Sequence, residues 1–241
     1  MSLYAIGDLH LSLGTNKPMD DFGGVWIDYF EKIKTGLSVL NDDDVCVLCG
    51  DTSWGMSLEE SLEDFRFIDS FPGKKLLIKG NHDYWWNTAK KMKSFFIKND
   101  IKSIDIIHNN SFLYGETAIC GTRGWMLEEG VAEAEHHLKI TAREAIRLRA
   151  SLVDAEAKEP KQKLCFFHYP PRFRDIVCDD IVNVMKEFNV CNCWYGHLHG
   201  MAHTMATRGE IDGIFYSMVS ADYLDFKPKL ILEKFAITEH F

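Results

Sequence analysis

Five short apolar runs in this chain each end in side chains that can ligate a metal ion. In four of them a glycine directly precedes the first such side chain, and glycine lets the backbone turn sharply and come close to a bound group. In layered α/β folds, ligands bind beyond the carboxyl ends of the strands. Five strand ends converging there would place seven ligand side chains in one crevice. These side chains are Asp8, His10, Asp51, Asn81, His168, His197 and His199.

The last of these runs ends in Gly196-His197-Leu198-His199-Gly200. Side chains alternate along an extended chain with a period of two, so His197 and His199 point the same way. Asp8 and His10 leave the first run with the same spacing. Two surface histidines at a strand end would explain His197 and His199 alone. They would not explain why the design recurs at four other strand ends.

Between and around these runs, apolar residues recur at helical spacing, and the alternation predicts an α/β fold. We see no internal repeat, low-complexity tract or linker, so residues 1–241 are expected to form a single domain. The expected helices cover residues 25–40, 57–71, 88–97, 131–157 and 179–188. The expected strands cover residues 3–6, 45–49, 75–79, 103–108, 111–114, 117–120, 163–167, 190–195, 214–219 and 229–236.

Composition and charge limit the classes of function. An apolar content of 46% allows a large core, and a net charge of −9 disfavours binding to long nucleic acid, which needs a basic surface. An acidic protein can still bind phosphates if metal ions supply the positive charge. No apolar run approaches the ~20 residues that span a bilayer, and no signal peptide is visible. We therefore expect a soluble, cytoplasmic protein that does not bind membranes, and leave the oligomeric state open.

The ligand types narrow the choice of metal. Two carboxylates, one amide oxygen and four imidazoles are too many for one tetrahedral site and too hard for a thiolate-type site. They suit two borderline divalent ions, such as Mn²⁺, Fe²⁺, Zn²⁺ or Ni²⁺, that share a bridging carboxylate. Two such ions ~3.5–4 Å apart clamp the attacking and leaving oxygens of an in-line phosphoryl displacement and lower the pKa of a bridging water.

The ordered motifs resemble those of the calcineurin-like metallophosphoesterase family, and the resemblance spans residues 7–199. It implies a four-layer α/β/β/α sandwich of two mixed sheets, with the di-metal site at the carboxyl ends of the strands. The motifs are Gly7-Asp8-Leu9-His10, Gly50-Asp51, Gly80-Asn81-His82-Asp83, His168 and Gly196-His197-Leu198-His199.

The resemblance also implies a role for each residue. Asp8, His10 and His199 would hold one ion. Asn81, His168 and His197 would hold the other, with Asp51 bridging the two. His82 would be catalytic, stabilising or protonating the leaving group, and Asp83 would be its orienting partner, because a carboxylate fixes the tautomer of an imidazole and raises its pKa.

The chain departs from the protein phosphatases of this family just after the second motif. Those enzymes carry an acidic residue and an arginine there, whereas this chain has Thr52-Ser53-Trp54-Gly55. The missing arginine disfavours a Ser/Thr protein phosphatase. Arg123, or Arg172 and Arg174, could supply the cation from elsewhere, although surface arginines are the simpler interpretation.

Tryptophans lie beside or between the motifs, at positions 54, 85, 86 and 125. Aromatic side chains there can stack on a nucleobase or another planar leaving group, or they can belong to the core. The candidate substrate contacts are Trp85, Arg123 and Trp125.

We therefore expect a hydrolase, a metal-dependent phosphoesterase whose substrate is a small phosphorylated molecule. A phosphodiester or nucleotide-like substrate is favoured over a phosphomonoester. A non-catalytic metal-binding scaffold of the same fold is the alternative of a different class, but its expected mark is an eroded site, above all the loss of His82. A nuclease that acts on long nucleic acid is disfavoured by the charge.

Overall fold

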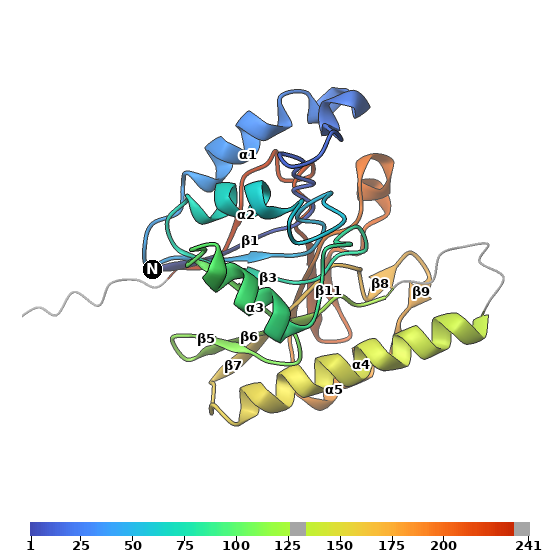
Figure 1. The fold of residues 1–241 in the computed structure, drawn as a ribbon. Coiled ribbons are helices and arrows are strands. Elements are labelled where there is room, and N and C mark those ends of the chain that lie inside the picture. The colour runs from blue at the N-terminus through green and yellow to red at the C-terminus, as the bar shows by residue number, and fades with distance from the viewer. Residues whose placement is uncertain (126–133, 234–241) are drawn as a thin grey trace, which may run out of the picture.

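Two mixed β-sheets face each other in the middle of the molecule, with helices on both outer faces (Figure 1). The computed structural model describes residues 1–125 and 134–233. Within these residues the first sheet has the strand order β13-β1-β2-β3-β4 and the second the order β11-β12-β10-β7-β6-β5. The strands of the first sheet are β1 (Ser2–Ile6), β2 (Val45–Leu48), β3 (Lys74–Leu77), β4 (Ile104–Ile106) and β13 (Lys229–Glu233). Those of the second are β5 (Phe112–Tyr114), β6 (Thr117–Thr122), β7 (Gln162–Phe167), β10 (Asn192–Tyr195), β11 (Gly209–Ile211) and β12 (Ile214–Met218).

Both sheets are parallel in their centres and antiparallel at an edge. Strands β1 to β4 run parallel, and β13 pairs antiparallel with β1. In the second sheet β6, β7, β10 and β12 run parallel, while β5 and β11 are antiparallel edge strands. The carboxyl ends of the parallel strands in each sheet therefore lie along one edge. The candidate ligands are in the loops that leave these strand ends.

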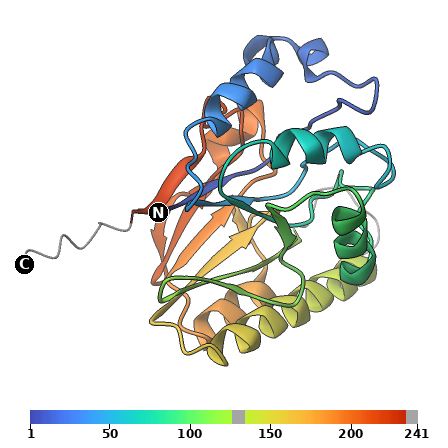
Figure 2. The same ribbon diagram turned by 60° about the vertical axis from the view of Figure 1, so that its left-hand side comes forward.

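The helices complete four layers, α/β/β/α, in which α1, α2 and α3 cover the first sheet and α4 and α5 cover the second (Figures 1 and 2). The two cores under the helices are separated by a third between the sheets, built from alternate strand residues such as Leu3, Val47, Leu164 and Phe166. The helices are α1 (Tyr29–Leu37), α2 (Leu62–Asp69), α3 (Ala89–Lys98), α4 (Ala134–Glu156) and α5 (Asp179–Glu187). Three 3-10 helices, η1 (Met19–Phe22), η2 (Gly24–Trp26) and η3 (Gly200–Met205), and a hairpin of β8 (Arg172–Phe173) and β9 (Ile176–Val177) complete the described elements.

The expected fold class, an α/β sandwich of two mixed sheets, is confirmed, and each expected element corresponds to one in the structure. The helix expected at 25–40 begins only at Tyr29, because Asp28 adopts a left-handed backbone conformation. The helix expected from Ser57 begins at Leu62, after a turn in which Ser57 accepts the N–H of Glu60. Residues 131–133 of the expected long helix and 234–236 of the last expected strand lie outside the described residues.

Candidate metal centre

The loops that leave the strand ends are held to one another by backbone hydrogen bonds. Asp8 N–H donates to the carbonyl of Gly50 at 2.9 Å, and His10 N–H donates to the carbonyl of Asp51 at 2.9 Å. Gly196 N–H donates to the carbonyl of His168 at 3.1 Å. These bonds join the loop after β1 to that after β2, and the loop after β10 to that after β7. The backbone N–H of His197, which donates to Asp8 Oδ2 at 2.9 Å, joins the two pairs of loops.

The seven expected ligands form two clusters. In one, atoms of Asp8, His10 and His199 lie within 4.8 Å of one another, and the Nε2 atoms of the two histidines are 3.4 Å apart. In the other, the Oδ1 atom of Asn81 lies 2.6 Å from His168 Nε2 and 3.0 Å from His197 Nδ1. His197 and His199 therefore face different clusters, although they are two residues apart.

Asp51 lies between the clusters. Its Oδ2 atom is 3.8 Å from His10 Nε2 and 3.5 Å from His168 Nε2. Its Oδ1 atom accepts the backbone N–H of His82 at 2.7 Å. One carboxylate therefore contacts both halves of the centre and the neighbouring loop.

Hydrogen bonds fix the ring nitrogens that face the centre. His168 Nδ1 donates to the carbonyl of Cys49 at 3.0 Å, so its Nε2 lone pair points toward Asn81 and His197. His199 Nδ1 contacts Asp222 Oδ1 at 2.9 Å, which leaves its Nε2 for the cluster with His10. Such imidazole–carboxylate and imidazole–carbonyl pairs usually orient metal-bound histidines. The ring nitrogens, carboxylates and amide oxygen that converge here form a donor set that fits two divalent ions.

Burial makes the centre depend on added positive charge. It raises the pKa of both Asp8 and Asp51 above the usual range of a carboxyl group, which disfavours their ionised forms. It lowers the pKa of His168 to about 3 and that of His197 to about 2, so both rings are neutral near pH 7. Neutral imidazoles are the form that ligates metals, and bound cations would offset the cost of the buried carboxylates.

The backbone at the ligands is strained. Asp8, His10, Asp51 and His197 all have positive φ, between 47° and 72°, a region that non-glycine residues rarely adopt. Strain of this kind persists where the surrounding structure imposes it, and it concentrates at functional sites.

Two of the glycines that precede candidate ligands, Gly80 and Gly196, have ordinary φ angles. They are needed because another ligand side chain packs directly against their backbone. A Cβ atom on Gly80 would lie 2.0 Å from Asp51 Oδ1, and one on Gly196 would lie 2.5 Å from Asp8 Oδ2. Each glycine thus lets one strand end pack directly against a ligand that follows another strand.

The expected pairing of Asp83 with His82 is wrong. The Asp83 carboxylate is fully buried and accepts backbone N–H groups of Thr52 at 2.8 Å and Gly80 at 2.7 Å. Its Oδ1 atom also accepts the indole N–H of Trp85 at 3.0 Å. The Nδ1 atom of His82 has no hydrogen-bond partner among the described residues. Asp83 therefore holds the loops after β2 and β3 together, because its oxygens are occupied by their N–H groups.

Trp54 takes the place beside His82 that was expected for Asp83. Its ring centroid lies 4.6 Å from that of His82 and 4.9 Å from that of His10, on which it stacks at 25°. Its indole N–H points away, toward the sulfur of Met19. The half-buried Trp54 thus forms one wall of the centre and restricts the His82 ring by packing.

The three expected substrate contacts, Trp85, Arg123 and Trp125, lie in different surroundings. Trp85 is completely buried, with its ring edge-on to Phe65 at 4.8 Å, and cannot touch a substrate, so that expectation is wrong. Arg123 is mostly buried, with its guanidinium 3.4 Å from Glu144 and stacked over Trp125 at 5.1 Å.

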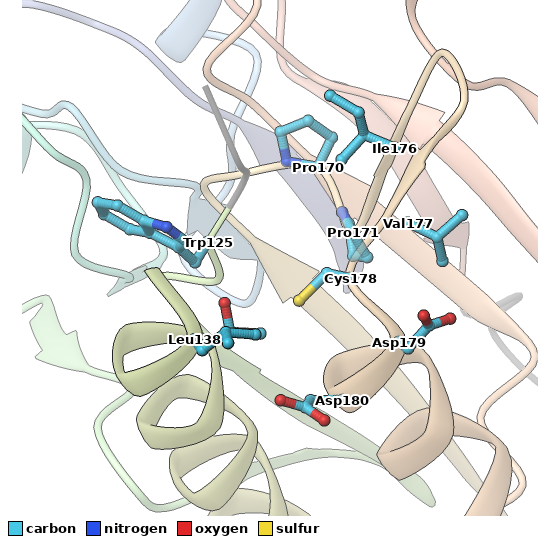
Figure 3. Close-up of a pocket in the computed structure, with 10 residues that line it drawn as sticks. Trp125, Leu138, Pro170, Pro171, Ile176, Val177, Cys178, Asp179 and Asp180 are labelled. Carbon is cyan, nitrogen blue, oxygen red and sulfur yellow. The ribbon is translucent and has the colours of Figure 1, made fainter. Parts of the chain in front are cut away.

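Trp125 lines a separate cavity of about 300 Å³ with Pro170, Pro171 and Cys178 (Figure 3). Its indole N–H donates to His137 Nδ1 at 2.9 Å. Its ring lies 5.2 Å from that of Tyr169, and Tyr169 in turn lies 4.2 Å from His197. The Tyr169 ring thus stands between Trp125 of this cavity and the candidate ligand His197.

Asp222 is a further site residue that was not expected from the sequence; its carboxylate contacts His199 Nδ1 at 2.9 Å and His203 Nε2 at 3.2 Å. It follows β12 by the short turn Val219-Ser220-Ala221. A sixth strand end that carries a carboxylate was therefore visible in the sequence, but no glycine precedes it and it matches none of the five motifs.

Replacing Asp222 with asparagine is expected to weaken divalent metal binding by about 10–100-fold, the usual effect of losing a carboxylate behind a metal-bound histidine. Burial disfavours the charged His199 ring, but the Asp222 bond and the Asp8 charge together raise its pKa to about 9. A metal ion must displace that proton, so the affinity of the unmodified protein should rise from pH 6.5 to pH 9. In Asp222→Asn this rise should be smaller, because the pKa of His199 falls.

Calorimetric titration with Mn²⁺ or Zn²⁺ at both pH values measures this effect. Asp225→Asn is the matched control, because the exposed Asp225 pairs only with Lys227 on the surface among the described residues. Equal affinity and an equal pH dependence in Asp222→Asn and Asp225→Asn would contradict the role of Asp222.

A comparison with family models now identifies the class of protein. The model described as calcineurin-like phosphoesterase matches residues 1–201, and the chain belongs to that family. It is thereby a hydrolase of the metal-dependent phosphoester-cleaving class. None of the curated proteins compared with the chain matches it. Among the described residues, no helix is long and apolar enough to cross a membrane.

Two solved structures resemble this chain at low sequence identity, and the first, with a TM-score above 0.5, shares its fold. The phosphopantetheinyl hydrolase PptH from Mycobacterium tuberculosis is 14% identical, with a TM-score of 0.53 and coverage of 97% of this chain and 96% of that one. The protein of unknown function AQ665 from Aquifex aeolicus is 14% identical, with a TM-score of 0.48 and 95% of each chain covered.

Proposed function

We propose that this protein hydrolyses small phosphodiesters or nucleotide-like phosphate esters with a pair of divalent ions, Mn²⁺, Fe²⁺, Zn²⁺ or Ni²⁺. The observation that carries the proposal is the arrangement of the seven ligands in two clusters, with Asp51 3.8 Å from one histidine and 3.5 Å from the other. Asp8, His10 and His199 would hold one ion, and Asn81, His168 and His197 would hold the other. The bound pair supplies an activated water and stabilises charge on the phosphoryl group.

His82 acts on the leaving group. It is half-buried, its backbone N–H is fixed by Asp51, and its ring centroid lies 5.8 Å from that of His10. An imidazole at this distance from the centre can donate a hydrogen bond to the departing oxygen without ligating a metal. Packing against Trp54 keeps the ring in place, since no carboxylate among the described residues does so.

The preference for a diester or nucleotide-like substrate rests on two features. The segment after Asp51 holds no arginine that could neutralise the second charge of a phosphomonoester. The partly exposed Trp54 beside His82 offers an aromatic face to a planar leaving group.

The direct test is hydrolysis of bis(4-nitrophenyl) phosphate and 4-nitrophenyl phosphate by the purified protein. Activity is expected to disappear after chelation and to return with at least one of the four metals, with the diester cleaved faster. Failure to cleave either ester with any of the four would contradict the proposed function and favour a non-catalytic scaffold. Faster cleavage of the monoester would overturn the substrate preference alone.

A further inference from the structure

A second, smaller cavity, of about 70 Å³, is lined by residues close in sequence to two candidate ligands, Asn81 and His168, or hydrogen-bonded to them. It is lined by three cationic side chains, Lys79, Arg123 and Arg147, and by one carboxylate, Glu144. Lys79 stands two residues before Asn81, and the Arg123 carbonyl accepts the backbone N–H of His168 at 3.1 Å. Two walls of the cavity therefore continue directly into metal ligands.

The carboxylate of Glu144 cannot neutralise this group. Its Oε1 atom accepts Arg147 Nη1 at 2.5 Å and Arg123 Nη2 at 3.4 Å, and its Oε2 atom accepts the hydroxyl of Thr122 at 2.5 Å. Both oxygens are thus engaged, and three positive charges face one negative charge among the described lining residues.

Two donors in the cavity lack acceptors. The Lys79 ammonium makes no hydrogen bond or ion pair with any residue that the structure describes, and the Nε atom of Arg123 is buried without a partner in the same described part of the chain. Burial lowers the pKa of His108 on the cavity wall, and the positive charge of Arg147 lowers it further. The buried, unpaired Nε atom of Arg123 costs free energy that an anionic acceptor would recover, whereas the half-buried Lys79 adds positive charge to the cavity wall.

We propose that Lys79, Arg123 and Arg147 bind a second phosphate group of the substrate, beyond the one that is cleaved. The inference rests on the proposed function and narrows the substrate class to molecules that carry two phosphates, such as nucleoside diphosphates. Guanidinium groups suit phosphate oxygens because their N–H groups match the geometry of the anion, and the lysine adds a point charge. The size of the cavity fits one small anionic group and leaves the organic part of the substrate outside.

The test compares Lys79→Gln with a matched control, Lys102→Gln, whose exposed ammonium pairs only with Asp100 on the surface among the described residues. The first measurement is calorimetric binding of inorganic pyrophosphate to the metal-loaded protein at fixed ionic strength. Lys79→Gln is expected to weaken it by about tenfold, because a charge-assisted hydrogen bond is lost, and Lys102→Gln is expected to bind as the unmodified protein does. Equal binding by both variants overturns the inference.

The second measurement is the ratio of kcat/KM for adenosine 5′-diphosphate to that for bis(4-nitrophenyl) phosphate, which carries a single negative charge. This ratio should fall by about tenfold in Lys79→Gln relative to Lys102→Gln, for the same loss of one charged contact. An unchanged ratio overturns the inference while leaving the proposed function intact. If no ester is hydrolysed at all, the proposed function fails, and pyrophosphate binding still decides whether the cavity is an anion site.

Discussion

Replacing Asp51 with asparagine is expected to lower kcat/KM for an aryl phosphate ester by at least on the order of 10²-fold. Substituting residues that only support metal ligands already lowers metal affinity or activity by about 10–100-fold, and Asp51 is expected to be a ligand itself. Asparagine has nearly the shape of aspartate, tolerates the positive φ of 49° at this position, and can still accept the backbone N–H of His82. The substitution therefore removes the negative charge between the two clusters while leaving the local fold in place.

Asp100→Asn is the matched control for this substitution, since Asp100 also has positive φ, 60°, and its side chain is exposed. Activity and the metal content of both variants should be measured on protein of the same thermal stability. Asp51→Asn is expected to retain less than the full complement of metal, because the shared carboxylate is gone. Unchanged turnover in Asp51→Asn would exclude a bridging role.

The fold and the convergence of the seven candidate ligands could be predicted because both depend on local patterns. Strand residues alternate between two faces, so a run such as the one before Asp8 indicates which side chains enter the core and where the strand stops. Ligands that follow strand ends inherit their positions from the sheet, and the parallel pairing of β1, β2 and β3 brings those ends together. Glycines also mark these strand ends. Gly196 is one example, because a Cβ atom at that position would clash with the carboxylate of Asp8.

The roles of Asp83 and Trp85 could not be predicted because they lie on a loop, where no periodicity fixes the direction of a side chain. The buried Asp83 side chain accepts the backbone N–H groups of Thr52 and Ser53, which lie thirty residues and more earlier in the chain. Trp85 is buried beside Asp83. A buried indole N–H needs a hydrogen-bond acceptor, and the Asp83 carboxylate supplies one. Contacts between two loops depend on the assembled tertiary structure, and the same holds for the stacking of Trp54 on His10.

Replacing His82 with alanine is expected to lower kcat by about 10²–10⁴-fold, the range that a positioned general acid or base contributes. Metal content should not change, because the seven ligand side chains in the two clusters do not include the His82 imidazole. The loss should be smaller for 4-nitrophenyl esters than for alkyl esters, because 4-nitrophenolate is a better leaving group and needs less protonation. This dependence separates a role in leaving-group departure from a role in binding.

Asp83→Asn is the comparison that distinguishes the two neighbouring residues. Asp83 accepts four N–H groups in a fully buried site, so its variant is expected to unfold at lower temperature, whereas His82→Ala should keep its thermal stability. If Asp83 instead oriented His82, Asp83→Asn would reproduce the leaving-group dependence of His82→Ala at unchanged stability. A histidine that only protonates the departing oxygen affects neither metal binding nor a leaving group that departs unaided. An equal loss of kcat for aryl and alkyl esters in His82→Ala, or a loss of bound metal, would therefore exclude the proposed role of His82.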